Sequence, residues 1–342
     1  MANPTKKRIF YFDALRALAI LLVILCHSSL RYKPFVYTSF KVAMPAIFFI
    51  ATHVAVPIFF MLSGALLLNR TYTLSDFFKR RFSRVLYPFI FWVIVAVFVA
   101  LFGVHHGPHD AFKIVVGSNR WTWFVWVMMG IYLFIPVVNS FIKEYKMTGV
   151  KFFLAIWFVT VVLFTFGKYP FYRFELSYFA NYIGYVVLGY YLANAEFRWS
   201  DLKIAVLGFI TAAVFLAIDF YTYAKDIPSV ETKYLSLFVV VASIGVFLMF
   251  RHFARHCDSH PDSALGRFHK RIENGKIGAV ILSLSTCSYG MYLVNSIIFK
   301  FLHDSYPLKF LPVIFIGVVV LSWLLVKLVS KIPYMSKFSG AA

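Results

Sequence analysis

The sequence predicts an all-α integral membrane protein, a compact bundle of about ten transmembrane helices with both termini in the cytoplasm. Two observations support this fold class. Of the 342 residues, 61% are hydrophobic and 14% are charged, against roughly 25% charged in a soluble domain. Apolar runs of roughly 17 to 25 residues, the length that crosses a bilayer as a helix, recur along nearly the whole chain.

The expected spans lie close together in the sequence, so we expect a single domain over residues 1–342 in which neighbouring helices pack antiparallel. The formal net charge of +20 resides mainly in alternate loops beside the apolar runs, where it indicates orientation rather than nucleic-acid binding. We therefore expect a multi-pass protein of the plasma (inner) membrane, with the lipid bilayer and no nucleic acid among its partners. The spans are about 9–30, 45–68, 85–104, 121–142, 151–167, 178–195, 203–223, 232–250, 277–301 and 310–330.

The first span carries three ionisable side chains, Asp13, Arg16 and His27. Such groups are costly in hydrocarbon, by about 3 kcal/mol on insertion scales, and therefore face a partner or a water-filled cavity. Asp13 and Arg16 are three residues apart, which predicts an ion pair. His27 follows Arg16 by eleven residues, about three helical turns, and returns to the same face about 16 Å further along the axis.

Two interpretations of these groups are open from the residues alone. In the first, all three face one cavity, and the spacing suits a cytoplasmic acyl-coenzyme A whose arm reaches from Arg16 to His27. In the second, Asp13 and Arg16 anchor the helix at the interface and His27 caps its outer end. The functional interpretation is favoured, because all three ionisable side chains lie on one face of the helix.

A dense cationic cluster follows the second span and consists of Lys79, Arg80, Arg81 and Arg84. Arginine forks suit phosphate groups, such as those of coenzyme A. The alternative is ordinary positive-inside anchoring or contact with anionic lipid. We expect these residues to bind the phosphates of a donor.

Weaker candidates occur in three other places. Arg173 and Glu175 lie among tyrosines on the predicted outer side, where they could contact a sugar, although interfacial tyrosines are ordinary anchors. Ser63 and Gly64 favour close helix packing over a nucleophilic serine.

The segment 251–276 is expected to be the longest cytoplasmic loop, and a solvated one. It holds residues of zinc-ligand type but no C-x-x-C or H-E-x-x-H pattern, so we expect no metal site. The residues concerned are His252, His256, Cys257, His260 and His269.

Motifs along the chain resemble those of the acyltransferase-3 family of membrane O-acyltransferases, most closely stand-alone members without an attached hydrolase domain. Each motif alone is apolar and of modest specificity. Together the motifs occur in the same order as in the family and cover most of the chain. The chain departs from the family pattern at two positions: Trp121 and Asn295 stand where the family often has histidine. The motifs are FD followed by Arg16 and His27, VPIFFMLSGALL at 56–67, FFKRRFSRVLYP at 77–88, WTWFVWVMMGIYLFIPVV at 121–138, YIGYVVLGYYL at 182–192 and SYGMYLVN at 288–295.

The resemblance implies transfer of an acyl group, usually acetyl, from cytoplasmic acyl-CoA to a hydroxyl of an extracytoplasmic glycan or glycolipid. Acetyl-CoA is then a donor substrate, and no tightly bound cofactor is expected. His27 would act as general base, Arg16 matches the family's first-helix arginine, and Asp13 would orient Arg16. A transient acyl-histidine remains an alternative route, and a multi-span transporter or flippase of a glycan precursor or small anion is the alternative function.

Overall fold

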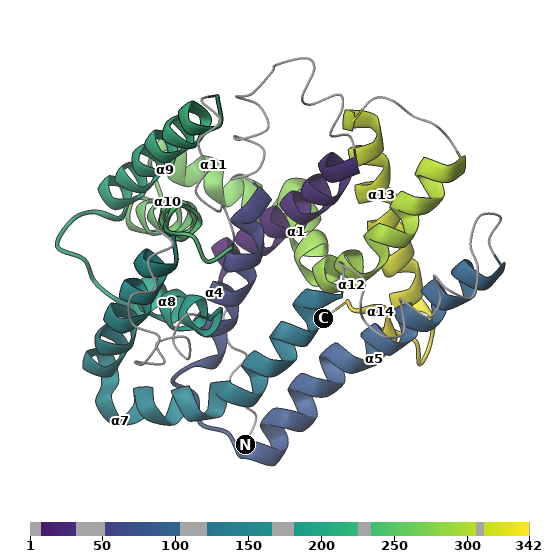
Figure 1. The fold of residues 1–342 in the computed structure, drawn as a ribbon, viewed down its shortest axis with the longest axis horizontal. Coiled ribbons are helices and arrows are strands. Elements are labelled where there is room, and N and C mark those ends of the chain that lie inside the picture. The colour runs from purple at the N-terminus through teal and green to yellow at the C-terminus, as the bar shows by residue number, and fades with distance from the viewer. Residues whose placement is uncertain are drawn as a thin grey trace.

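The structure of the chain is a computed structural model that describes residues 8–31, 52–102, 122–165, 181–224, 234–305 and 311–341. These residues form α-helices joined by short connections, and no β-strand occurs among them (Figure 1). The all-α prediction is therefore confirmed. The helices are α1 (Phe10–Arg31), α4 (Ala55–Leu67), α5 (Leu74–Phe102), α7 (Trp123–Thr165), α8 (Ile183–Asn194), α9 (Asp201–Ala224), α10 (Leu237–Ser259), α11 (Ala264–Glu273), α12 (Lys276–Ser305), α13 (Leu311–Lys331) and α14 (Ser336–Ser339).

Among the described residues, six helices are long and apolar enough to cross a membrane, namely α1, α5, α7, α10, α12 and α13. This finding confirms a multi-pass helical protein, whereas the count of ten spans and the cytoplasmic placement of both termini stay predictions. The described parts of the spans expected at 121–142 and 151–167 belong to one helix, α7. Lys146 has non-helical angles, φ 51° and ψ −139°, and bends α7 into two arms (Figure 1).

The prediction of a long solvated loop over 251–276 is wrong, because most of this segment is helical. Helix α10 continues to Ser259, just before Pro261, and α11 begins at Ala264. The hydroxyl of Ser263 accepts a hydrogen bond from the Gly266 backbone nitrogen at 2.9 Å and so caps α11. The polar composition of this segment indicates exposure to water, not an absence of helix.

Helices α4 and α8 cross at very close range through two glycines. A Cβ atom on Gly64 would overlap the carbonyl oxygen of Val186, and one on Gly189 would overlap the carbonyl oxygen of Met61. Neither position has room for a larger side chain, which confirms the close helix packing predicted at Gly64.

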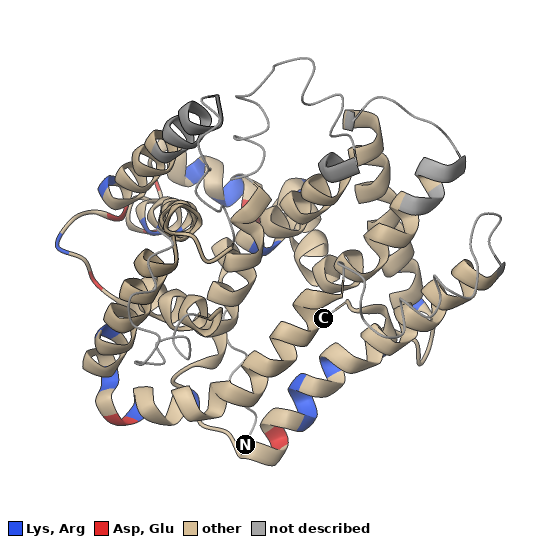
Figure 2. Ribbon diagram, in the orientation of Figure 1, with Lys and Arg blue, Asp and Glu red and all other residues tan. Residues whose placement is uncertain are grey.

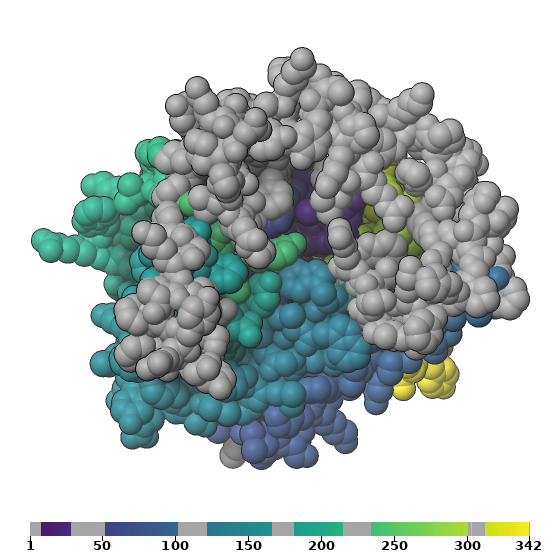
Figure 3. All heavy atoms as spheres, in the orientation of Figure 1, coloured from purple at the N-terminus to yellow at the C-terminus, as the bar shows by residue number. Residues whose placement is uncertain are grey.

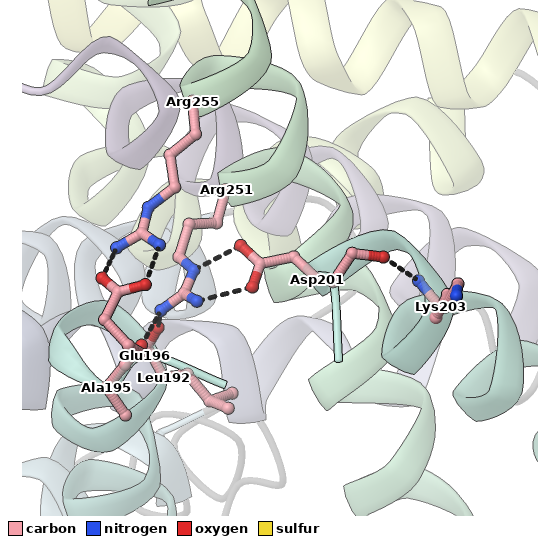
Figure 4. A network of polar contacts seen from close by, with 8 residues as sticks. Leu192, Ala195, Glu196, Asp201, Lys203, Arg251 and Arg255 are labelled. Carbon is pink, nitrogen blue, oxygen red and sulfur yellow. Dashed lines mark hydrogen bonds and ion pairs between the residues drawn. The ribbon is translucent and has the colours of Figure 1, made fainter. Parts of the chain in front are cut away.

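A buried arginine joins α10 to the end of α8 and the start of α9 (Figure 4). Arg251, 1% exposed, donates from Nε and Nη2 to the Asp201 carboxylate at 2.6 Å each. Its Nη1 donates to carbonyl oxygens at the end of α8, that of Ala195 at 2.9 Å. Beside this network, hydrogen bonds from exposed Arg255 hold the pKa of Glu196 below its ordinary value. The end of α8 and the start of α9 are thereby fixed to α10.

Basic residues mark the start of α5 and the bend of α7 (Figure 2). Contacts bring these ends together: Asn139 Nδ2 donates to the carbonyl oxygen of Arg70 at 2.9 Å, and Lys143 Nζ donates to Thr71 Oγ1 at 3.2 Å. The alternating topology expected from the sequence places these segments on the same side of the bundle.

Candidate functional site

Helix α1 runs without interruption from Phe10 to Arg31, so Arg16 and His27 share one straight element, as predicted. It packs against α12, α4, α13 and α10. The face drawn in Figure 3 is hollowed near its centre, where purple atoms of α1 are visible. Asp13 is buried and Arg16 and His27 are partly buried, so the predicted face of α1 lies inside the bundle.

His27 is bound by a side chain that lies 268 positions away in the sequence. Its Nδ1 lies 2.8 Å from Oδ1 of Asn295, which is fully buried on α12. Asn295 Nδ2 donates to the carbonyl oxygens of Met291 at 3.0 Å and Tyr292 at 2.6 Å. Because carbonyl oxygens only accept, the Asn295 amide group is oriented with Oδ1 toward the ring.

This orientation decides which nitrogen of His27 carries the proton. Asn295 Oδ1 is an acceptor, so His27 Nδ1 must donate to it. In the neutral imidazole the proton then resides on Nδ1, and Nε2 keeps its lone pair. A histidine held in this tautomer is suited to remove a proton from a hydroxyl, or to attack a carbonyl, through Nε2.

The close ion pair predicted between Asp13 and Arg16 is not formed, because Arg8 is the salt-bridge partner of Asp13, although the charges of Asp13 and Arg16 still interact electrostatically. Arg8 binds the Asp13 carboxylate with two hydrogen bonds, from Nε at 2.6 Å and from Nη2 at 2.9 Å, and the carboxylate raises the pKa of Arg8. Ser285 of α12 donates to the same carboxylate at 2.6 Å. Asp13 therefore ties the start of α1 to α12, and its charge also acts on Arg16.

Arg16 and Arg81 interact electrostatically with the same tyrosine. The hydroxyl of Tyr132, on α7, interacts electrostatically with the guanidinium groups of Arg16, Arg81 and Arg84. The hydroxyl of Tyr72 interacts with Arg81 and is buried without a hydrogen-bond partner among the described residues. Burial raises the pKa of Tyr72, so this hydroxyl stays protonated and can donate. Such a set of donors is suited to hold an anion.

The four cationic residues predicted to bind phosphate do not share one environment. Lys79, Arg80 and Arg84 are exposed, whereas Arg81 is partly buried beside Tyr132. Arg81 is therefore the least exposed member of the cluster; Arg84, although exposed, also interacts with Tyr132, whereas Lys79 and Arg80 lie at the rim.

Four other sequence candidates remain to be placed. Arg173, Glu175 and Trp121 lie outside the described residues. Ser63 donates its hydroxyl to the Phe59 carbonyl at 2.9 Å, within its own helix.

The histidines near the end of α10 form a stack on the helix surface. Ring centroids are 6.0 Å apart for His252 and His256, and 4.8 Å apart for His256 and His260. His269, on α11, packs its ring against Phe10 at 5.7 Å. Among the described residues, no group of three histidine, cysteine or acidic side chains is placed to hold a metal ion.

Several site residues escape sequence reasoning. Tyr132, Tyr72 and Ser285 lie in ordinary apolar or polar contexts, and nothing in their local sequence distinguishes them. Asn295 did carry a signal, because it replaces a residue that the resembled family often has as histidine. Its contact with His27 shows that this late motif lies beside the first-helix motif.

Comparison with known protein families identifies the family of the chain. Residues 9–327 match the sequence model of a family described as an acyltransferase domain. The matched region includes both ends of the α1 site and all of its partners except Arg8. No curated protein and no solved structure matches the chain.

Proposed function

The chain belongs to the acyltransferase-3 family, and we propose that it moves an acyl group, acetyl by default, from cytoplasmic acyl-CoA to a hydroxyl of an extracytoplasmic glycan or glycolipid. Family membership and the apolar helices make it a membrane acyltransferase. The observation that carries the finer proposal is the hydrogen bond from His27 to Asn295, which leaves Nε2 free as a base.

The donor is held at the N-terminal half of α1. Arg16 and Arg81, with the hydroxyls of Tyr132 and Tyr72, supply positive charge and hydrogen-bond donors for the phosphates of coenzyme A. The axial distance from Arg16 to His27, about 16 Å, is comparable to the extended phosphopantetheine arm. A donor bound at the arginines therefore presents its thioester near the imidazole.

The reaction is then acyl transfer assisted by one base. His27 Nε2 takes the proton of the acceptor hydroxyl as its oxygen attacks the thioester carbonyl. The tetrahedral intermediate collapses with cleavage of the carbon–sulfur bond, and the coenzyme A sulfur takes the proton back from the imidazolium. Asn295 Oδ1 accepts from Nδ1 throughout and stabilises the transient positive charge. Attack of Nε2 on the thioester, giving an acyl-histidine, uses the same tautomer.

The proposal is tested by the release of free coenzyme A from acetyl-CoA by purified protein, with a membrane glycolipid extract as acceptor. His27→Gln is expected to lower kcat by about 10²- to 10⁴-fold, the usual contribution of a general base. Arg81→Ala is expected to raise the KM for acetyl-CoA by about tenfold, as expected for a lost contact of about 1.4 kcal/mol.

Arg80→Ala is the matched control, because this neighbouring arginine is exposed and lies at the rim. Equal effects of Arg80→Ala and Arg81→Ala would contradict the placement of the donor. No consumption of any acyl-CoA by the wild-type protein would favour the transporter or flippase hypothesis instead.

A further inference from the structure

Helix α11 lies between two helices that cross the membrane, α10 and α12. Asn274 and Gly275 separate its end at Glu273 from the start of α12 at Lys276, so these two helix ends are at most about 11 Å apart. Ile277, in the first turn of α12, is apolar and 60% exposed, as expected of a side chain that meets lipid. Helix α11 is therefore held at the surface of the bilayer.

Contacts with α1 and α10 fix how α11 is turned about its own axis. The ring of His269 packs against Phe10 of α1 at 5.7 Å and against Phe253 of α10 at 5.3 Å. The thiol of Cys257, on α10, donates to the carbonyl oxygen of Leu265 at 3.7 Å. The side of α11 that carries His269 therefore points toward the protein, and the same contact joins α11 to the start of α1.

The remaining surface of α11 has an apolar side and a basic side. At about 100° per residue, Leu265, Phe268 and Ile272 fall within an arc of about 60°. Leu265 is 41% exposed and Phe268 is 56% exposed, although both are apolar. A helix with a basic face opposite an apolar face is suited to lie in the plane of a membrane surface. The opposite side carries three exposed basic residues, Arg267, Lys270 and Arg271.

The charge of the basic side is not balanced by the acidic residue of the same helix. The carboxylate of Glu273 lies toward His269, with Oε2 at 3.9 Å from Nε2. Arg267 donates to the backbone carbonyl oxygen of Asp262, a neutral group that leaves the charge of the guanidinium in place. A free phosphate ion would meet these cations but would leave Phe268 in water. An anionic phospholipid satisfies both sides, because its headgroup meets the cations and its acyl chains meet the apolar side chains.

We propose that α11 is an interfacial helix that binds anionic phospholipids of the adjacent leaflet. Its two exposed apolar side chains insert at the boundary between headgroups and acyl chains, and its three basic side chains bind lipid phosphates. Since His269 packs on Phe10, this contact also holds the start of α1, which carries Arg16, at the membrane surface. The inference is independent of the acyl-transfer reaction.

The first test measures the depth of α11 in the bilayer. Phe268→Cys and, as the matched control on the opposite side, Lys270→Cys are labelled with a nitroxide in the full-length protein, whose native cysteines are buried. The protein is reconstituted in vesicles of phosphatidylcholine and phosphatidylglycerol. We expect oxygen, which dissolves in lipid, to relax the label at 268 more strongly than a water-soluble nickel chelate does, and the reverse at 270. Equal access of the nickel chelate to both labels would overturn the inference.

The second test measures the preference for negative charge. Phosphatidylglycerol is titrated into purified protein in a neutral detergent, and its half-saturating concentration is read from the rise in the unfolding temperature. Each cation beside an anionic surface contributes about a fivefold preference, so replacing all three basic residues of α11 with glutamine should raise that concentration about 100-fold. The matched control removes the same charge from exposed sites outside α11, with Lys151→Gln, Arg198→Gln and Lys203→Gln combined.

Three results of this titration would overturn the inference: equal half-saturation in the two triple variants, equal stabilisation by phosphatidylcholine, and equal stabilisation by soluble glycerol phosphate, which would indicate a free-phosphate site. If the α11 triple variant does not fold, Lys270→Gln and Arg271→Gln are measured singly. Each is then expected to raise the half-saturating concentration about fivefold, and no change in either would contradict the proposal.

Discussion

Replacing Asn295 with alanine removes the group that fixes the proton on Nδ1 of His27. In the native protein this proton lies in a 2.8 Å hydrogen bond to a fully buried acceptor. Alanine offers no acceptor, so the imidazole is free to place its proton on either nitrogen and to rotate. Both changes reduce the fraction of His27 that can act through Nε2.

The size of the effect follows from the charge that develops on the ring. When Nε2 takes a proton, the Nδ1–H···Oδ1 contact becomes a hydrogen bond from a charged donor, which contributes about 1.5–3 kcal/mol. Because each 1.36 kcal/mol is a factor of ten in rate, kcat is expected to fall about 10- to 150-fold in Asn295→Ala. The KM for acetyl-CoA should change little, since the donor is held by Arg16 and Arg81.

The assay is steady-state release of coenzyme A by purified Asn295→Ala, with thermal unfolding to confirm that the variant is folded. Thr286→Val is the matched control, because Thr286 is a polar residue of α12 whose hydroxyl donates to carbonyls of its own helix. Asn295→His should recover most of the activity, since an imidazole can also accept from Nδ1. A folded Asn295→Ala variant with wild-type kcat would refute the role of Asn295.

Three further predictions concern other contacts. Arg251→Met should lower the free energy of unfolding by about 3–5 kcal/mol, because it leaves a buried carboxylate unpaired. Arg255→Ala removes an exposed arginine and should lower it by less than about 1 kcal/mol; thermal unfolding monitored by tryptophan fluorescence compares the two variants. Asp13→Ala should lower the unfolding temperature, because it removes the contacts to Arg8 and Ser285, and an unchanged unfolding temperature would contradict this role. Arg16→Ala should raise the KM for acetyl-CoA, and an unchanged KM would contradict the proposed placement of the donor. Ser63→Ala should keep kcat within about twofold of the wild-type value, because the Ser63 hydroxyl bonds within its own helix. Its loss should change the free energy of unfolding by only about 1 kcal/mol. An inactive but folded variant would instead support a nucleophilic role for Ser63.

Local and periodic features of this protein were predictable from the sequence. The apolar runs gave the membrane helices, because their length reflects the bilayer and not the tertiary fold. The spacing of Arg16 and His27 placed both on one face of a single helix, since helical geometry is the same in every protein. The pair Ser63–Gly64 gave the close crossing of α4 and α8, for which small residues are needed.

Choices between distant partners were not predictable in the same way. Asp13 has an arginine on each side in the sequence, and helical spacing favoured Arg16 as its partner. In the structure the Asp13 carboxylate instead binds Arg8, which precedes the helix, and Ser285 of α12. The inward position of Arg81 among its basic neighbours depends on where Tyr132 of α7 lies. The polar composition of 251–276 hid two helical segments, because composition reports exposure to water and not backbone conformation.

The central claim, that this membrane protein transfers an acyl group through His27, is tested most directly by following the label of acetyl-[¹⁴C]CoA. Purified protein in proteoliposomes with a glycolipid extract is incubated with the donor, and the label is counted in the lipid phase. We expect the label to appear in glycolipid with the wild-type protein and with Arg80→Ala, and to be lost with His27→Gln. Label that stays in acetyl-CoA with the wild-type protein, or that reaches glycolipid equally with His27→Gln, would contradict the claim.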